Sequence, residues 1–217
     1  MWWAGRVHQW SVVVPAKRLA LAKTRLRPLT DGAPVEHADV VLALLADTVA
    51  AALDCPRVER VLVVTDDPAA AETVRALGAG TVADEPDEGL NPALVHGARS
   101  TGAAAVAALS SDLPALRPEE LAAALDAAGT APRCFVADAE GTGTTLLTAV
   151  GVPLDPRFGA GSAAAHRASG AVPLAGTWPG LAADVDTEAA LRRALALGVG
   201  PATTSVAARL GIASPCR

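Results

Sequence analysis

The chain is poor in several residue types, and each shortage narrows what it can be. Its 217 residues include no tyrosine, one methionine and three cysteines, Cys55, Cys134 and Cys216. The cysteines lie far apart without a CxxC pair, so they suit neither a zinc site nor a disulfide scaffold. No apolar run approaches the roughly 20 residues of a membrane-spanning helix, and the first ten residues contain no signal-peptide core. We therefore expect a cytoplasmic protein that has no membrane partner.

The charge balance excludes a further class of proteins. The formal net charge is −5, from 18 basic and 23 acidic residues, whereas nucleic-acid-binding domains are usually basic. We expect no nucleic-acid partner. Lysine is scarce, because 16 basic residues are arginines and the two lysines, Lys17 and Lys23, lie six positions apart. Lysine is a compact point charge on a flexible stem, so either chance or a need for ammonium groups accounts for this pair.

Several familiar catalytic signatures are also missing. The chain has no GxxxxGK(S/T) phosphate-binding loop and no GxSxG motif, which excludes a P-loop enzyme and disfavours a triad hydrolase. A GxGxxA pattern occurs at residues 159–164, but the preceding LDPRF segment cannot form the buried strand that a dinucleotide site needs. None of the four histidines is paired with a candidate nucleophile, so we assign them no catalytic role.

About half of the residues, 51%, are apolar, which is enough to form a sizeable core. We expect one domain over residues 1–217, with residues 1–10 frayed. Short apolar runs alternate with helical periodicity, which predicts an α/β domain of three layers with a mostly parallel sheet and some antiparallel strands. We expect strands at 11–14, 60–65, 81–83, 104–109, 134–137, 144–148, 171–174 and 181–185. We expect helices at 36–54, 68–77, 162–169 and 187–197, and further helices that begin near Asn91 and Pro118.

Two local details of these helices can be checked. In the helix at 36–54, Asp39 and Asp47 lie off the apolar stripe formed by Val40, Leu44 and Ala51. We therefore expect both carboxylates to lie away from the core. In the helix that is expected to begin near Asn91, Asn91 is the expected N-cap and Pro92 is the first helical residue.

In a sheet of this kind, ligands bind beyond the carboxyl ends of the parallel strands. One strand end is basic, at Lys17 and Arg18, and several others are acidic. A basic loop that faces carboxylates indicates a phosphorylated ligand and a hard cation, because Mg²⁺ usually takes one or two carboxylates plus phosphate oxygens of the substrate. The acidic ends are Asp66-Asp67, Asp84-Glu85, Ser110-Ser111-Asp112 and Asp184-Val185-Asp186.

Asp112, Asp184 and Asp186 are the candidate metal ligands. Asp112 follows a buried run, and its alternative role is that of an ordinary turn residue. Asp184 and Asp186 alternate along an expected extended segment, so they point to one face, where two like charges cost free energy unless a cation offsets them. The alternative for Asp186 is that it caps the helix beginning at Thr187.

Residues 17–27 carry five cations in eleven positions. A charge run is usually a solvated face, but this one directly follows an expected buried strand. That placement favours a triphosphate-binding loop, whose charges act most strongly where water is excluded. The Gly141–Thr145 segment also offers amide and hydroxyl groups to an anion, with a plain glycine-rich turn as its alternative.

Five segments together resemble the 2-phospholactate/phosphoenolpyruvate guanylyltransferases of coenzyme F-420 biosynthesis. The resemblance spans residues 11–209, and its specificity comes from the order and spacing of the segments. They are VVVPAKRLALAKTRL, DEPDEGLNPAL, SSDLPAL, DAEGTGTTLL with PRFGAGSAAAH, and LAADVDTEAAL.

The resemblance implies a nucleotidyltransferase-type fold and a Mg²⁺-dependent reaction between GTP and phosphoenolpyruvate that releases pyrophosphate. It implies that Lys17, Lys23 and Asp112 are catalytic. The metal ligands would be Asp112, Asp184 and Asp186, and the contacts to phosphoenolpyruvate would be Thr144, Gly159 and Ser162. The nucleotide would meet Lys17 and Lys23 at its triphosphate and Gly89, Leu90 and Asn91 at its guanine.

Three alternatives stay open at the level of the sequence. The acceptor is phosphoenolpyruvate or 2-phospho-L-lactate, which no residue here decides. A nucleotidyltransferase for another phosphorylated acceptor is the second alternative, and a non-catalytic nucleotide-binding module is the third. The family resemblance also leaves a homodimer open.

Overall fold

The computed structural model describes residues 8–19 and 22–212. Its centre is a seven-stranded sheet with the order β3-β2-β1-β4-β6-β5-β7. Among the described strands, β6 alone runs opposite to its neighbours β4 and β5. The expected mostly parallel sheet with an antiparallel component is therefore confirmed. The strands are β1 (Trp10–Pro15), β2 (Val58–Val64), β3 (Gly80–Val82), β4 (Ala105–Leu109), β5 (Arg133–Ala137), β6 (Thr144–Val150) and β7 (Val172–Pro173).

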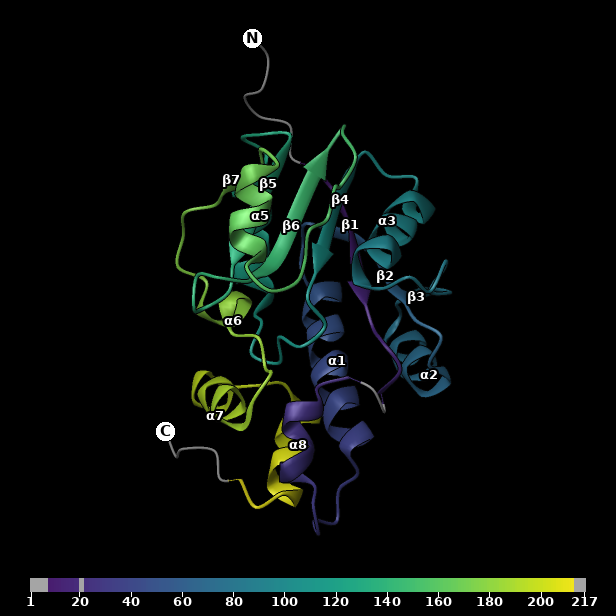
Figure 1. Ribbon diagram of the computed structural model, residues 1–217, viewed down its shortest axis with the longest axis vertical. Helices are drawn as coiled ribbons and strands as arrows, with labels where there is room; N and C mark the ends of the chain where they lie inside the picture. The colour runs from purple at the N-terminus through teal and green to yellow at the C-terminus, as the bar shows by residue number, and fades with distance from the viewer. Residues whose placement is uncertain (1–7, 20–21, 213–217) are drawn as a thin grey trace.

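Helices cover both faces of the sheet, as Figure 1 shows. One apolar cluster joins α1, α2 and α4 to one face, and a second joins α3 and α5 to the other. The strand β1 contributes side chains to both clusters, because Val12 and Val14 pack in the first and Val13 packs in the second. The helices are α1 (His37–Leu53), α2 (Pro68–Leu77), α3 (Leu90–Thr101), α4 (Pro118–Ala128), α5 (Ser162–Ala168), α6 (Pro179–Ala182), α7 (Glu188–Leu197) and α8 (Pro201–Arg209).

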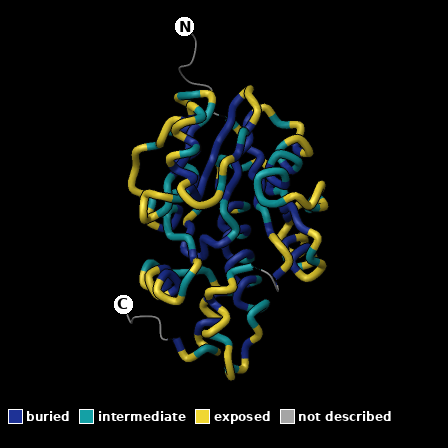
Figure 2. Tube along the Cα trace, in the orientation of Figure 1, coloured by how far each residue is buried: buried dark blue, intermediate teal, exposed yellow. Residues whose placement is uncertain are grey.

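A third apolar cluster lies beyond the end of the sheet. There α7, α8 and the 3-10 helix η2 (Thr24–Leu29) pack around the N-terminal part of α1. Leu26, Leu44 and Leu191 are almost completely buried in this cluster. It holds η2 and the start of α7 beside the sheet edge, where the sequence predicts the ligand site. Figure 2 shows that the residues of the sheet are the buried centre of the molecule and that exposed residues lie mainly in the outer turns and helices.

Most expected elements are present, with corrections in the last third of the chain. No strand forms at 181–185, since Pro179 begins the short helix α6 and the residues after it are irregular. The 3-10 helix η2 and the helices α6 and α8 are additions to the expected set. The expectation for Asp47 is wrong as well, because its carboxylate is buried and accepts hydrogen bonds from the backbone N–H groups of Ala202 and Thr203 at 3.0 and 2.8 Å. These donors lie at the start of α8. Because the sequence analysis did not predict this helix, it did not predict the burial of Asp47 either.

Trp10 is buried and begins β1, although it was counted in the frayed segment, while residues 1–7 lie outside the described residues. Cys55 and Cys134 are free, buried thiols, and Cys216 lies outside the described residues. Within the described ranges, no helix combines the length and the apolar character that crossing a membrane requires.

Candidate active site

A cleft of about 650 Å³ opens at the carboxyl edge of the sheet. The strands β1 and β4 end at this edge, and β6 begins there because it runs antiparallel to β4. The topology therefore gathers strand-end residues and the first residue of β6 around one space. Nine of the eleven predicted site residues line it: Lys17, Lys23, Leu90, Asp112, Thr144, Gly159, Ser162, Asp184 and Asp186.

The three predicted metal ligands lie on one wall of the cleft, which we call the charged wall. Asp112 follows β4 and is buried, and its backbone carbonyl accepts a hydrogen bond from the N–H of Val185 at 3.0 Å. Val185 is itself buried, so this bond fixes its neighbours Asp184 and Asp186 beside Asp112. The strand expected at 181–185 is absent, but Asp184 and Asp186, which that strand was expected to align, still line the same cleft.

The alternative role of Asp186 as a helix cap is excluded by the geometry at α7. The N-cap is Thr187, whose hydroxyl accepts a hydrogen bond from the N–H of Ala190 at 3.2 Å. The carboxylate of Asp186 instead receives a hydrogen bond and an ion pair from the ammonium of Lys23. Its side chain is 53% exposed, against 7% for that of Asp112. Asp186 is therefore the accessible carboxylate of the charged wall.

Lys23 joins the two carboxylates. Its ammonium donates to both Asp112 and Asp186, and its backbone adopts a left-handed conformation at φ 51° just before η2. Burial by itself would lower the pKa of Lys23, but the charges of Asp112 and Asp186 outweigh it and raise the pKa above its ordinary value. Lys23 was predicted to contact a triphosphate, whereas here it neutralises part of the charged wall.

One ammonium does not balance three carboxylates. Burial, followed by the negative charges of Asp112, Asp186 and Asp138, raises the pKa of Asp184 to about 6. Burial also raises the pKa of Asp112 against the opposing charge of Lys23. An ionised Asp184 is therefore costly in this wall unless more positive charge arrives.

The charged wall fits a magnesium ion that shares its ligands with a substrate. No group of three or more His, Cys, Asp or Glu side chains in the described residues converges closely enough to hold a metal ion. Two carboxylates do share one cation, since the ammonium of Lys23 bridges Asp112 and Asp186. Mg²⁺ normally takes one or two carboxylates and completes its shell with water and phosphate oxygens. The donor set thus suits magnesium when a phosphate is present.

Another part of the cleft lining carries neutral hydrogen-bonding groups, and we call it the hydroxyl wall. It consists of Thr144 at the start of β6, Gly159 in the loop before α5, and Ser162 as the first residue of α5. The hydroxyl of Ser162 donates to that of Thr144 at 3.2 Å, and Nδ1 of His166 lies 2.9 Å from the Thr144 hydroxyl. These side chains are buried, so the wall is formed before any ligand binds.

The loop that carries Gly159 is anchored by a pair of hydrogen bonds to the side chain of Asn91. The side-chain amide of Asn91 donates to the carbonyl of Phe158 at 3.1 Å and accepts from its N–H at 2.8 Å. Gly159 and Gly161 have φ angles of 137° and 70°, which side chains with a Cβ rarely adopt. The high glycine content of this loop is thus a requirement of its backbone.

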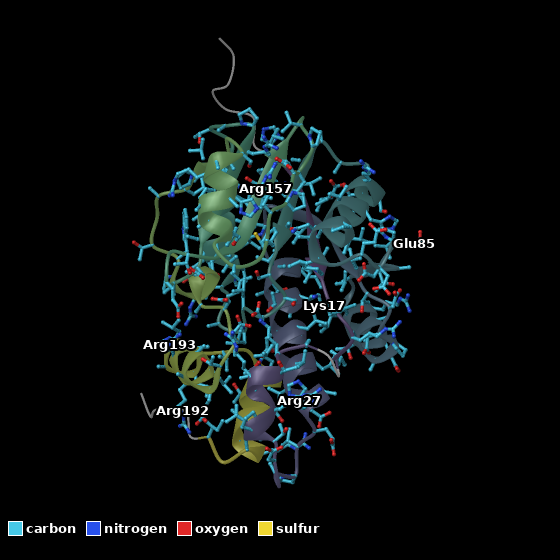
Figure 3. All side chains as sticks on the ribbon, in the orientation of Figure 1. Lys17, Arg27, Glu85, Arg157, Arg192 and Arg193 are labelled. Carbon is cyan, nitrogen blue, oxygen red and sulfur yellow. The ribbon has the colours of Figure 1, made fainter. Side chains whose placement is uncertain are left out.

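On the nucleotide side, the structure changes the expected role of one residue. Gly89 is the N-cap of α3, so the expectation that Asn91 caps this helix is wrong. Leu90 lines the cleft, and Lys17 is an exposed side chain on the same cleft. Figure 3 shows Lys17 near the middle of the molecule and Arg157 beside α5.

Two further residues were missed by the sequence reasoning. The carboxylate of Asp138 lines the cleft and accepts hydrogen bonds from the N–H groups of Thr142 and Gly143 at 2.9 and 2.8 Å. His166 was set aside, yet it contacts Thr144. The spacing of Ser162 and His166, four residues apart on an expected helix, places both on one face and was a usable signal.

Solved structures resemble this fold at low sequence identity. A nucleotidyl transferase from Methanothermobacter thermautotroptrophicus superposes with a TM-score of 0.59 and 19% identity, covering 85% of this chain and 95% of that chain. A cytidylyltransferase from Leptospira borgpetersenii gives a TM-score of 0.58 and 10% identity, with coverage of 97% and 98%. At these identities the likeness shows the fold, which is of the nucleotidyltransferase type.

Proteins of similar sequence identify the family within this fold. A protein from Geodermatophilus obscurus named phosphoenolpyruvate guanylyltransferase is 71% identical over 203 residues, which cover 92% of this chain and 94% of the relative. A protein of the same name from Streptomyces coelicolor is 57% identical over 211 residues, with coverage of 94% and 99%. The family model described as guanylyl transferase CofC-like matches residues 10–169. The chain therefore belongs to the CofC-like family of guanylyl transferases.

Proposed function

We propose that this protein is a phosphoenolpyruvate guanylyltransferase. It would transfer the GMP moiety of GTP to phosphoenolpyruvate, giving enolpyruvoyl-2-diphospho-5′-guanosine and pyrophosphate, as a step of coenzyme F-420 biosynthesis. Relatives between 50% and 71% identical carry this name. The observation that supports the proposal is that the charged wall and the preformed hydroxyl wall line one and the same cleft.

The chemistry requires no general base. The nucleophile is a phosphate oxygen of phosphoenolpyruvate, and a phosphate monoester is largely ionised at pH 7. This oxygen forms a bond to the α-phosphorus of GTP while the bond from that phosphorus to the pyrophosphate oxygen breaks. The electron pair leaves with pyrophosphate, and no proton has to be removed. The residues of the cleft then serve mainly to position two anions and to reduce their repulsion.

The charged wall would supply the electrostatic part. Asp112 and Asp186, which already share one cation, would hold Mg²⁺ together with phosphate oxygens of the substrates, and Asp184 beside them would be the third predicted ligand. The bound ion would supply positive charge to the reacting phosphate and to the leaving pyrophosphate. Lys17 and Lys23 would contact the triphosphate. The long, flexible stem of Lys23 allows its ammonium to leave the carboxylates and follow the phosphates.

The hydroxyl wall would hold the acceptor. Thr144, Gly159 and Ser162 would contact phosphoenolpyruvate through hydroxyl and backbone groups. Guanine would lie near Gly89, Leu90 and Asn91. The side-chain amide of Asn91 already bonds Phe158, so Gly89 and Leu90 would meet the base through their backbone.

The test is a coupled pyrophosphate assay. The purified chain is incubated with GTP, ATP or CTP and with phosphoenolpyruvate, 2-phospho-L-lactate or 3-phosphoglycerate, with and without MgCl₂. We expect pyrophosphate only with GTP, phosphoenolpyruvate and magnesium together. Turnover with 2-phospho-L-lactate and not with phosphoenolpyruvate would identify 2-phospho-L-lactate as the acceptor. The absence of turnover with any phosphorylated three-carbon acid would overturn the proposal.

Two finer statements belong to the same proposal. We place the enzyme in the cytoplasm, because GTP and phosphoenolpyruvate are made and consumed there, and cell fractionation tests this placement. Pairing into a homodimer stays a prediction from the family resemblance. Sedimentation equilibrium on the purified chain decides it.

A further inference from the structure

His166 forms hydrogen bonds through both of its ring nitrogens, each to a group that lies at or beside the cleft. The residue is completely buried in α5. Its Nε2 lies 2.9 Å from the backbone nitrogen of Arg157, and its Nδ1 lies 2.9 Å from the hydroxyl oxygen of Thr144. The ring thus connects the loop that carries Gly159 to the hydroxyl wall of the cleft.

The hydrogen bond from Arg157 fixes where the imidazole proton resides. A backbone N–H always donates, so Nε2 of His166 must be the unprotonated acceptor. The proton of the neutral ring is therefore on Nδ1. It follows that Nδ1–H donates to the hydroxyl oxygen of Thr144 and cannot accept the hydroxyl proton of that residue.

The same reasoning extends to the two hydroxyl groups. Thr144 and Ser162 together have two hydroxyl protons, and one of them lies in the bond between the two oxygens. Because His166 accepts neither, the other proton must point elsewhere, and both residues line the cleft. The hydroxyl pair consequently presents one O–H donor to a ligand, which suits a group that only accepts, such as a carboxylate or a phosphate.

We propose that His166 is a positioning residue, whose Nδ1–H tautomer orients the Thr144–Ser162 pair so that it donates a hydrogen bond to the anionic acceptor substrate. This role rests on the proposed function for the identity of the acceptor, but the tautomer itself does not depend on any substrate. Among the residues proposed to contact the acceptor, His166 hydrogen-bonds Thr144, and it takes no part in bond making.

The surroundings of His166 keep its ring neutral. Burial, and then the positive charge of Arg157, lower the pKa of His166 to about 4, while Asp155 acts in the opposite direction and Arg133 in the same one. A protonated ring would also lose the bond from the Arg157 N–H, because both nitrogens would then donate. The donor orientation is thus maintained at neutral pH.

A purely structural role is the competing explanation. The ring of His166 packs against those of Phe135 and Phe158, with centroid separations of 5.9 and 5.2 Å. A histidine that only fills this space would stabilise the fold without affecting one substrate more than the other. The two roles therefore differ in which Michaelis constant changes, while the Nδ1–H tautomer is a condition that the positioning role must meet.

The first experiment reads the tautomer directly. The full chain is labelled with ¹⁵N-histidine, and the imidazole nitrogen resonances are recorded at pH 7 without substrate. The spectrum of His166→Leu assigns the signal. We expect His166 in the Nδ1–H form, and an Nε2–H form would overturn the proposal. Because no substrate is present, failure of the proposed function would leave this result unaffected.

The second experiment is a double-mutant cycle in steady-state kinetics. We expect His166→Leu to raise the KM for phosphoenolpyruvate about tenfold and to leave the KM for GTP within about twofold of the wild type. His166→Asn, whose amide can replace the Nδ1–H donor, should recover most of this loss. In a Thr144→Val background, His166→Leu should add little, because the hydroxyl that it orients is gone.

Three results would contradict the positioning role. They are full additivity of the two substitutions, an equal rise in both Michaelis constants, and a loss of thermal stability with unchanged kinetics. If His166→Leu does not fold, the comparison of His166→Asn with the wild type and the wild-type tautomer still decide the proposal. Absence of wild-type turnover would overturn the proposed function, and the tautomer would then decide the assignment of His166.

Discussion

The two walls of the cleft differ in how far their polar groups are neutralised within the protein. On the hydroxyl wall, Thr144, Ser162 and His166 are buried, neutral and bonded to one another. On the charged wall, Asp112 and Asp186 share the ammonium of Lys23, and the pKa of Asp184 beside them is raised to about 6 by burial and by its acidic neighbours. One wall is complete without a ligand, and the other has an excess of negative charge.

This difference indicates how a site for two anions is divided. Neutral hydrogen bonds can be satisfied inside the protein, so the hydroxyl wall is preorganised at little cost. Carboxylates that must receive a cation cannot be fully neutralised beforehand, because a bound partner would compete with it. On the proposed function, the charged wall gives up some folding stability in order to bind a cation, so substitutions on the two walls should have different effects.

The largest expected effect is on catalysis, from Asp112→Asn. Removing this buried charge deletes the carboxylate that Lys23 and the proposed magnesium share, and we expect kcat to fall by roughly 1,000-fold or more. The fold should persist, because asparagine has nearly the same shape. Pyrophosphate release and circular dichroism measure the two quantities. Asp126→Asn, which breaks an exposed ion pair with Arg57, is the matched control and should keep its activity; an active Asp112→Asn would remove Asp112 from the site.

Lys23→Met should separate the two roles of the ammonium. We expect turnover to fall about 100-fold, because the triphosphate loses a cation. Affinity for magnesium in the absence of nucleotide should rise, because Lys23 no longer pairs with Asp112 and Asp186. Titration calorimetry with MgCl₂ measures the affinity. Unchanged metal affinity would show that the ammonium and the metal use different oxygens.

Asp184→Asn tests the cost of the charged wall. The pKa of Asp184 is raised in the folded protein to about 6, from 3.8, so at pH 7 its ionised form destabilises the folded state. That cost disappears as the pH falls through 6 toward 4, since the folded protein takes up the proton first. Without magnesium at pH 7, the variant should be more stable than the wild type by about 2 kcal/mol. Urea unfolding at pH 7 and at pH 5 measures this difference, which should shrink at the lower pH; a variant less stable than the wild type at pH 7 would contradict it.

The smallest expected effect is that of Asn91→Ala on the hydroxyl wall. It removes both hydrogen bonds that hold Phe158 and hence the position of Gly159. We expect the KM for phosphoenolpyruvate to rise about fivefold and the free energy of unfolding to fall by about 1 kcal/mol. Steady-state kinetics and urea unfolding measure these changes. A rise confined to the KM for GTP would instead place the Asn91 side chain against the base.

Local sequence signals predicted the elements that dominate the first two thirds of the chain. Pro15, Gly78 and Pro118 mark where elements begin or end, and the structure has β1, α2 and α4 at those places. The same signals placed Lys17 and Asp112 at strand ends, and both line the cleft. These predictions succeed because each depends on a few neighbouring residues.

The errors concern residues whose partners are distant in the chain. Asp47 is buried because its oxygens bind the N–H groups at the start of α8, which lie 155 and 156 residues away. Asn91 bonds the backbone of Phe158, which is 67 positions away, instead of capping its own helix. In each case a local pattern suggested one use for a polar side chain and a tertiary contact supplied another.

The sequence by itself determined the α/β class, the basic and acidic strand ends and the family resemblance, because these depend on periodicity, on turn residues and on the order of short motifs. Only the tertiary structure decided which groups meet. The reversal of β6 brings Thr144 to the edge where β1 and β4 end, and the hydrogen bond from Val185 to Asp112 sets Asp184 and Asp186 beside that edge. Such contacts depend on strand direction and packing across the whole sheet, which no local stretch of residues specifies.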